Sequence, residues 1–167
     1  ALRAIVDRHE VLRTNILSEK GVGYQAIKGP EGWSLGMEEV SEEGLLAAQL
    51  DQYLATPFDL SSDFMLRARL YGLGGDHYVL AVVIHHIAGD GWSMGVLVDE
   101  FTELYSALRA GRKSALPTLT RQYSDYAVWQ RKHLSEAVLD GQLAYWEGNL
   151  AGVQPLFLPT DRPRPSV

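Results

Sequence analysis

Two adjacent histidines, an aspartate and two glycines lie within seven residues of one another, in the segment HHIAGDG at 85–91. A neutral imidazole in a preorganised loop can accept a proton from a nucleophile or donate a hydrogen bond. Gly91 has no side chain, so its amide can approach a reacting carbonyl, and Asp90 can orient the loop through an ion pair. These residue types therefore predict a binding or catalytic site in this loop.

A strand and a helix should hold the loop at its two ends. Residues 78–84 (YVLAVVI) form an unbroken apolar run, which predicts a strand buried on both faces. Ser93 stands where a helix N-cap is expected, and Gly111 where a glycine often follows a helix. Between them, residues spaced as i, i+3, i+4 and i+7 predict one apolar helix face: Met94, Leu97, Val98, Phe101, Leu104, Tyr105 and Leu108. Loops anchored in this way often carry function.

The two histidines should point in opposite directions if the strand continues through them, since side chains alternate along a strand. Only one can then face a given cavity, while the other packs in or behind the sheet. Zinc bound by His85, His86 and Asp90 is disfavoured, because adjacent strand histidines diverge and no third neutral ligand lies nearby. A second alternative is that both histidines are core residues without a chemical role.

A serine hydrolase is a third alternative. Residues 91–95 (GWSMG) match G-x-S-x-G between a strand and a helix, with Asp125 and His133 following in the expected order. The nucleophile should follow the strand directly, whereas the seven residues 85–91 stand here between the strand and the Trp92-Ser93 pair. A helix cap therefore explains Ser93 better than a catalytic triad does.

Length and composition indicate one ordinary globular domain of 167 residues, 46% of them hydrophobic and 22% charged. The net charge of −6 argues against nucleic-acid binding, and no apolar run approaches the ~20 residues of a membrane span. The absence of cysteine excludes disulfides and thiolate metal sites and fits a cytoplasmic protein.

The remaining segments predict a mixed sheet with helices packed on it, an α/β sandwich. Segment 72–76 (GLGGD) is a turn, so 65–71 and 77–84 should form an antiparallel hairpin. The other expected strands cover 11–17, 22–28 and 33–40. The expected helices cover 1–10, the segment from Ser41 to Pro57 with Leu46, Leu50, Tyr53 and Leu54 on its apolar face, 121–134, and a last one with Leu139, Leu143, Trp146 and Leu150, ending near Gly152.

Six segments of the chain resemble, in order, the condensation domains of non-ribosomal peptide synthetases. HHIAGDGWS at 85–93 is similar to the family motif HHxxxDG(W)S. The others are RHEVLRT at 8–14, with Ile16 where phenylalanine is usual, PFDL at 57–60, YSDYAVW at 123–129, Tyr145-Trp146, and LPTDRP at 158–163. The resemblance covers nearly the whole chain.

The resemblance implies a chloramphenicol acetyltransferase-like fold of two lobes, with the active site in a tunnel between them. Carrier proteins deliver the donor and the acceptor from opposite faces, each as a thioester on phosphopantetheine, and no cofactor is bound directly. The implied reaction is amide-bond formation by attack of the acceptor α-amine on the donor thioester. A neighbouring adenylation domain is the other expected partner, and neither nucleic acid nor a membrane is expected.

The resemblance also implies roles for individual residues. His86 is the active-site histidine, as a general base or as a positioner of the amine, and His85 is its buried neighbour. Gly91 contributes its backbone near the carbonyl. Asp90 is structural, with Arg8 or Arg13 as its expected ion-pair partner. The segments 57–60 and 123–129 are expected to serve packing.

The resemblance leaves two alternatives for function. An epimerisation or other condensation-like domain shares HHxxxDG, although Trp92 and the segment 123–129 favour condensation. A catalytically silent module that only receives a carrier protein is the other. The domain boundaries expected are 1–158 for an N-terminal lobe truncated at its start, and 159–167 for the Pro-rich start of an interlobe linker. Without the C-terminal lobe, the fragment alone is expected to be inactive.

Overall fold

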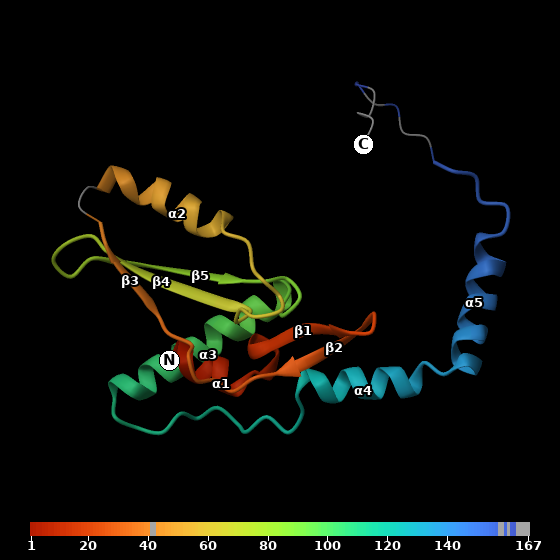
Figure 1. The fold of residues 1–167 in the computed structure, drawn as a ribbon, viewed down its shortest axis with the longest axis horizontal. Helices are drawn as coiled ribbons and strands as arrows, with labels where there is room; N and C mark the ends of the chain where they lie inside the picture. Colours follow the sequence, from red (N-terminus) through yellow and green to blue (C-terminus); the bar gives the residue numbers. More distant parts are fainter. Residues whose placement is uncertain (41–42, 157–158, 160, 163–167) are drawn as a thin grey trace. The chain divides into compact units, whose positions relative to one another are not determined.

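The computed structural model describes residues 1–40, 43–156, 159 and 161–162 (Figure 1). It divides into two compact units, residues 1–126 and 127–167. The expected cap Ser41 and most of the expected linker 159–167 lie outside the described residues.

A three-stranded mixed sheet forms the centre of the first unit. Its order is β3 (Gly36–Glu39), β4 (Leu66–Gly72) and β5 (Tyr78–Ile84), with β3 parallel to β4 and β4 antiparallel to β5. The predicted hairpin is thus confirmed. Its register places Leu66 opposite Ile84 and Gly72 opposite Tyr78. The His85 N–H donates to the Met65 carbonyl at 2.9 Å, which extends the pairing by one residue into the histidine loop.

A separate antiparallel hairpin is formed by β1 (Thr14–Glu19) and β2 (Val22–Ile27). Lys20 and Gly21 turn the chain between the strands, both at positive φ (52° and 80°), as a two-residue hairpin turn requires. The predicted strand at 11–17 begins too early, because Glu10–Arg13 is a 3₁₀ turn, η1. The Thr14 hydroxyl donates to the Glu10 carbonyl at 2.7 Å and closes this turn. The strand expected at 33–40 is shorter than predicted.

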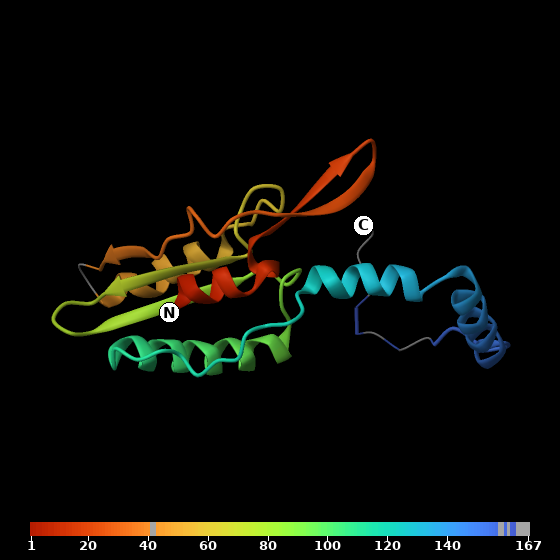
Figure 2. The ribbon, with the colours of Figure 1, turned by 90° about the horizontal axis from the view of Figure 1, so that it is seen from below.

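Helices cover both faces of the three-stranded sheet (Figure 2). On one face, α1 (Leu2–Arg8) and α3 (Gly91–Arg109) pack over Leu66, Ala68, Val82 and Ile84. On the other face, α2 (Leu46–Ala55), preceded by the 3₁₀ turn η2 (Glu43–Leu45), packs over Tyr71, Val79 and Ala81. The two faces follow from the alternation of side chains along β4 and β5.

Two expectations about apolar faces are wrong. Strand β5 is not fully buried on both faces. Val79 and Ala81 pack under α2, but Tyr78 and Leu80, which alternate with them and point to the opposite face, are exposed. Only its later residues Val82 and Ile84 join the core under α1 and α3. The core-facing stripe of α3 is also narrower than predicted: it consists of the partly buried Leu97, Phe101 and Leu104 and the buried Glu100 and Ala107. Of the residues predicted for the apolar faces of α3 and α2, Met94, Val98, Tyr105, Leu108 and Leu54 are exposed.

The predicted C-terminal helices are present as α4 (Tyr123–His133), which begins in the first unit, and α5 (Glu136–Leu150). None of the described residues of the second unit is buried. The periodic residues Leu139, Leu143, Trp146 and Leu150 of α5 are all exposed. Over the part of the chain that the structure describes, no helix is both long and apolar enough to cross a membrane.

Trp33 provides a test of the packing on the α1 face. It is 5% exposed, and its indole N–H donates to the Leu66 carbonyl at 2.8 Å. Trp33→Phe should lower the free energy of unfolding by about 1–3 kcal/mol, because it leaves a buried carbonyl unpaired. Urea unfolding followed by circular dichroism measures this. Trp92→Phe is the control, since Trp92 is 86% exposed and its loss should leave stability unchanged.

Candidate active site

His85 is held inside the loop by its neighbours. It is half-buried, its Nδ1 accepts the Ile87 N–H at 3.1 Å, and its ring meets the edge of Phe58 at 5.5 Å between centroids. Phe58 in turn lies under the Arg67 guanidinium, 3.9 Å from the ring centroid. Arg67 also donates to the Thr56 carbonyl just after α2. The PFDL segment therefore supports His85 by packing, as expected.

His86 is exposed and lines a cavity of about 180 Å³ at the start of α3. The other lining residues are Ile84, Gly89, Asp90, Gly91, Ser93 and Met94. The two histidines thus differ in burial, but not because a strand runs through both. Strand β5 ends at Ile84, and His86 lies within a turn that the Ala88 N–H closes on the His85 carbonyl.

Asp90 is the N-cap of α3. Its carboxylate accepts the Ser93 N–H at 2.9 Å and the Ser93 hydroxyl at 2.7 Å, while the Asp90 N–H donates to the same hydroxyl at 3.1 Å. This capping box places Ser93 at the third helical position, so the prediction of Ser93 as the cap is wrong. Hydrogen bonds from the Ser93 N–H and hydroxyl lower the pKa of the Asp90 carboxyl below its usual value.

The same capping box argues against the serine hydrolase alternative, because it binds the Ser93 hydroxyl that would be the nucleophile. The Ser93 hydroxyl donates to Asp90 and accepts from the Asp90 N–H. Asp125, the second residue of that alternative, accepts the Gln122 N–H at 2.8 Å at the start of α4. Both side chains therefore stabilise the beginning of a helix, which explains their positions without hydrolysis.

Gly91 is the first residue of α3, where the backbone N–H groups have no partner within the helix. A Cβ placed on Gly91 would meet no atom within 4 Å, so its backbone is open to a ligand. Gly89 differs, because a Cβ there would come within 3.3 Å of the Ser93 Cβ. A side chain at Gly89 would therefore require Ser93 to shift by a few tenths of an ångström, whereas one at Gly91 would not.

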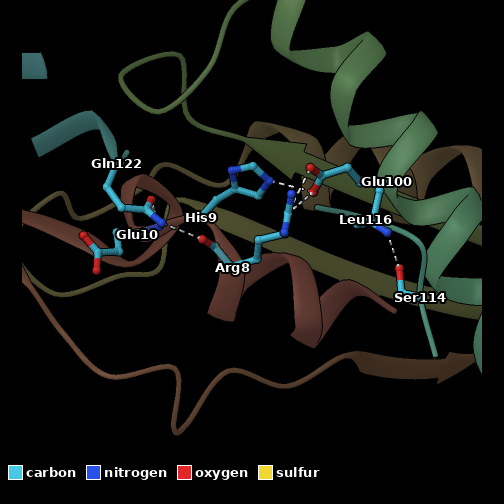
Figure 3. A network of polar contacts seen from close by, with 7 residues as sticks. All are labelled: Arg8, His9, Glu10, Glu100, Ser114, Leu116 and Gln122. Atoms are coloured by element: carbon cyan, nitrogen blue, oxygen red, sulfur yellow. Dashed lines mark hydrogen bonds and ion pairs between the residues drawn. The ribbon is translucent and has the colours of Figure 1, made fainter. Parts of the chain in front are cut away.

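The expected ion pair between Asp90 and Arg8 or Arg13 is not formed, because both arginines have other partners. Arg8 binds Glu100 of α3: its Nε donates to the two carboxylate oxygens at 3.0 and 3.2 Å (Figure 3). Arg13 donates to the carbonyls of Lys28 at 2.6 Å and Asp7 at 3.3 Å, and stands 3.6 Å from Glu10. Asp90 itself is exposed and does not point back into the protein.

Glu100 is the functional candidate that sequence reasoning missed. It is 7% exposed, and besides Arg8 it contacts His9, whose Nε2 lies 2.7 Å from Glu100 Oε2 (Figure 3). Its position was a usable signal. Glu100 follows Leu97 by three residues and precedes Leu104 by four, so it lies in the core-facing stripe of α3. A carboxylate in such a stripe requires polar or charged partners, and the RHE segment supplies two, the Arg8 guanidinium and the His9 imidazole.

Gln122 joins the start of α4 to the same region. Its side-chain amide donates to the Arg8 carbonyl at 3.0 Å, and its oxygen accepts the Glu10 N–H at 3.2 Å (Figure 3). These two bonds satisfy backbone groups between α1 and η1.

A second cavity, of about 170 Å³, lies between α1, η1 and the start of α3. His9 and Trp92 line it together with the apolar residues Ile5, Val11, Leu12, Ile84, Ala88, Val96 and Leu97, and with Gly89 and Ser93. Ile84, Gly89 and Ser93 also line the cavity of His86, so they form a wall between the two. Among the described residues, no three His, Cys, Asp or Glu side chains are arranged to hold a metal ion.

The role of Asp90 as a cap gives a test with a defined pH dependence. Asn caps helices about as well as Asp, so Asp90→Asn should keep the melting temperature at pH 7, whereas Asp90→Ala should lower it. The pKa of Asp90 is lowered on folding, so its stabilisation is present above the usual value of 3.8 and lost as the pH falls through the folded value. The difference in melting temperature between wild type and Asp90→Ala should therefore shrink on acidification. A large loss in Asp90→Asn at pH 7 would contradict the capping role.

Comparison with known proteins identifies the family. Residues 1–167 match the family model of the condensation domain. The chain is 43% identical, over 98% of its length, to one of the linear gramicidin synthase subunits of Brevibacillus parabrevis, and 42% identical, over all of it, to the beauvericin nonribosomal cyclodepsipeptide synthetase of Beauveria bassiana. It spans only 3% and 5% of these two proteins.

Solved structures agree with the sequence comparisons. The chain superposes with a TM-score of 0.84 on a structure described as a complex of the X-domain and OxyB from teicoplanin biosynthesis, at 34% identity, over 99% of this chain and 37% of that one. With the epimerization domain from the third module of tyrocidine synthetase B, the TM-score is 0.81 at 25% identity, over 95% and 37%. These neighbours have the chloramphenicol acetyltransferase-like fold, which confirms the expected fold class. The chain belongs to the condensation-domain family of nonribosomal peptide synthetases, a family whose activity is peptide-bond formation.

Proposed function

We propose that this chain supplies the histidine loop of an amide-forming condensation site. The observation that carries the proposal is the cavity in which the exposed His86 and the backbone of Gly91 meet at the start of α3. An imidazole and a free helix N-terminus are the groups that attack by an amine on a carbonyl can use. Donor and acceptor arrive as thioesters on the phosphopantetheine of two carrier proteins, and the chain binds no cofactor of its own.

In the proposed reaction the acceptor α-amine attacks the donor thioester carbonyl. A C–N bond forms, the C–S bond breaks, and the amine proton leaves with the carrier thiol. His86 acts on the amine, either as the proton acceptor or as the hydrogen-bond partner that orients it. The Gly91 N–H faces the carbonyl oxygen, where negative charge develops. Asp90 and His85 keep the loop in shape and do not take part in the chemistry.

The rest of the site lies, in this proposal, in a C-terminal lobe. The chain covers 37% of the two solved neighbours described above. We assign residues 1–158 to an N-terminal lobe and 159–167 to the start of the linker between the lobes. The proposal also includes an adenylation domain next to this domain in the full-length protein, and a cytoplasmic location. Residues 1–167 alone should form no product, since neither thioester is held against the other.

Epimerisation is the second candidate, favoured by the likeness to the epimerization domain of tyrocidine synthetase B. It uses the same loop but moves a proton at Cα and joins no two substrates. A module that only receives a carrier protein would do neither. The product therefore separates the three functions: a dipeptidyl thioester, an inverted stereocentre, or unchanged substrates.

The two histidines should differ in their effects on the intact domain. With both carriers loaded, His86→Ala should lower the rate of dipeptide formation by about 10²–10⁴-fold, the usual effect of a general acid–base group. His85→Ala should mainly lower the melting temperature, because His85 packs against Phe58 and accepts the Ile87 N–H. Product by mass spectrometry, at equal folded fraction, is the measurement. Equal rate losses with unchanged melting would count against this assignment, as would dipeptide made by residues 1–167 alone.

Gly91→Ala tests the approach of the backbone to the carbonyl. A Cβ at this position has room in the free protein, and alanine favours helix, so folding should be intact. If the Gly91 N–H must face the reacting carbonyl, the added methyl should lower the rate by about tenfold or more at unchanged stability. Gly95→Ala is a matched control, since it adds the same methyl to open space one turn further along α3. An unaffected rate in Gly91→Ala would remove Gly91 from the site.

A further inference from the structure

We infer that Glu100 is a positioning residue for the condensation site, acting through the placement of α3. The inference rests on the proposed function, because it concerns the histidine loop at the start of that helix. Glu100 lies nine residues after Gly91, about 13 Å along the helix axis, and its hydrogen bonds go to Arg8 and His9, neither of which lines the cavity of His86. Its effect must therefore pass through the helix.

Two kinds of contact hold α3 in place, apolar packing and the hydrogen bonds of Glu100. Leu97, Phe101 and Leu104 pack on the core by apolar contacts, which are not directional and allow small shifts along the helix axis. The bonds of Glu100 are directional. Arg8 Nε contacts both carboxylate oxygens, and His9 Nε2 contacts one of them at 2.7 Å (Figure 3). Glu100 is thus the residue that fixes the position of α3 along its axis against α1.

The position of α3 determines the shape of the histidine loop. Only residues 85–90 join β5 to α3, and the loop is fixed at its strand end by the bond from His85 to Met65. At its helix end it is fixed by the capping box of Asp90 and Ser93. A loop this short, tied at both ends, changes its shape when α3 moves. The distance between His86 and Gly91 therefore depends on where α3 stands.

The backbone on either side of His9 is itself held in place by Gln122. Gln122 binds the Arg8 carbonyl and the Glu10 N–H, and fixes the end of α1 from the other side. The His9 side chain also lines the cavity that lies against Gly89 and Ser93. The cluster of Arg8, His9 and Glu100 thus supports the wall behind the histidine loop.

The experiment compares two glutamates of the same helix in the intact domain with loaded carriers. Glu100→Gln keeps the size of the side chain and removes the charge. Glu103→Gln is the matched control, since Glu103 pairs with Arg112 at 2.8 Å and joins α3 to the loop after it, not to α1. Glu100→Gln should lower kcat by about tenfold or more at equal folded fraction, with the KM for the acceptor carrier changed less than about twofold. Glu103→Gln should leave both unchanged.

A second measurement reads the loop directly. Hydrogen–deuterium exchange over residues 85–93 should be faster in Glu100→Gln than in wild type and unchanged in Glu103→Gln. If Glu100→Gln yields little folded protein, Arg8→Lys replaces it, since it keeps the charge but loses the two Nε bonds, and the same effects are expected. Unchanged kcat and unchanged loop exchange would overturn the positioning role, as would equal effects of the two glutamates. A wild-type domain that forms no dipeptide would instead reject the proposed function, while loop exchange would still decide whether Glu100 controls the loop.

Discussion

A buried carboxylate on a helix that otherwise packs by apolar contacts sets the main constraint of the first unit. Removing an unpaired charge from water costs several kcal/mol, so Glu100 is stable in the core only with cations against it. Arg8, the last residue of α1, supplies the positive charge, and the ring of His9 beside it makes a further contact with the carboxylate at 2.7 Å. Because the bonds are short and directional, they specify which residues of α1 and α3 face each other, which apolar packing alone would leave loose. The position of the histidine loop follows from this choice.

Three acidic residues in or just before α3 have different structural roles. Asp90 caps its first turn, Glu100 fixes its middle to α1, and Glu103 holds the loop that follows. The pKa of Glu103 falls to about 2 because Arg112 and the Ala115 N–H donate to its carboxylate. Each of the three carboxylates accepts hydrogen bonds from donors of the protein itself. In the proposed function, the exposed His86 is the residue of the loop that acts on the amine.

Local patterns predicted the elements well. The turn GLGGD between two apolar runs specified the β4–β5 hairpin, and the 3.6-residue period specified α3 and α5. The predictions that failed depended on tertiary partners. Whether β5 is covered on both faces depends on which elements lie beside it, and the residues of 1–40 and 43–156 cover only part of it. The partner of Arg8 could not be chosen between Asp90 and Glu100 from spacing alone. The position of Glu100 within the apolar stripe was the only clue in its favour.

The sequence indicated that Asp90 is structural, but it did not indicate which groups bind its carboxylate. A carboxylate before a helix can be stabilised by an arginine or by the free N–H groups of the first turn. The sequence pattern, an acidic residue just before a helix, is the same in both cases. The cap is favoured here because Ser93 stands three residues on and returns a hydrogen bond to the Asp90 N–H.

In the proposed site, the Asp90 cap affects the Gly91 N–H in two opposite ways: through its charge and through the position it gives this group. Its negative charge beside Gly91 opposes the build-up of charge on a carbonyl oxygen facing that amide, so it weakens the electrostatic pull of the helix N-terminus. Two hydrogen bonds from Ser93 offset part of this charge. In return, the cap fixes the first turn of α3, to which the Gly91 N–H belongs. For the attack of an amine on a thioester that we propose, a fixed direction of this donor preserves the reaction geometry on which the rate depends.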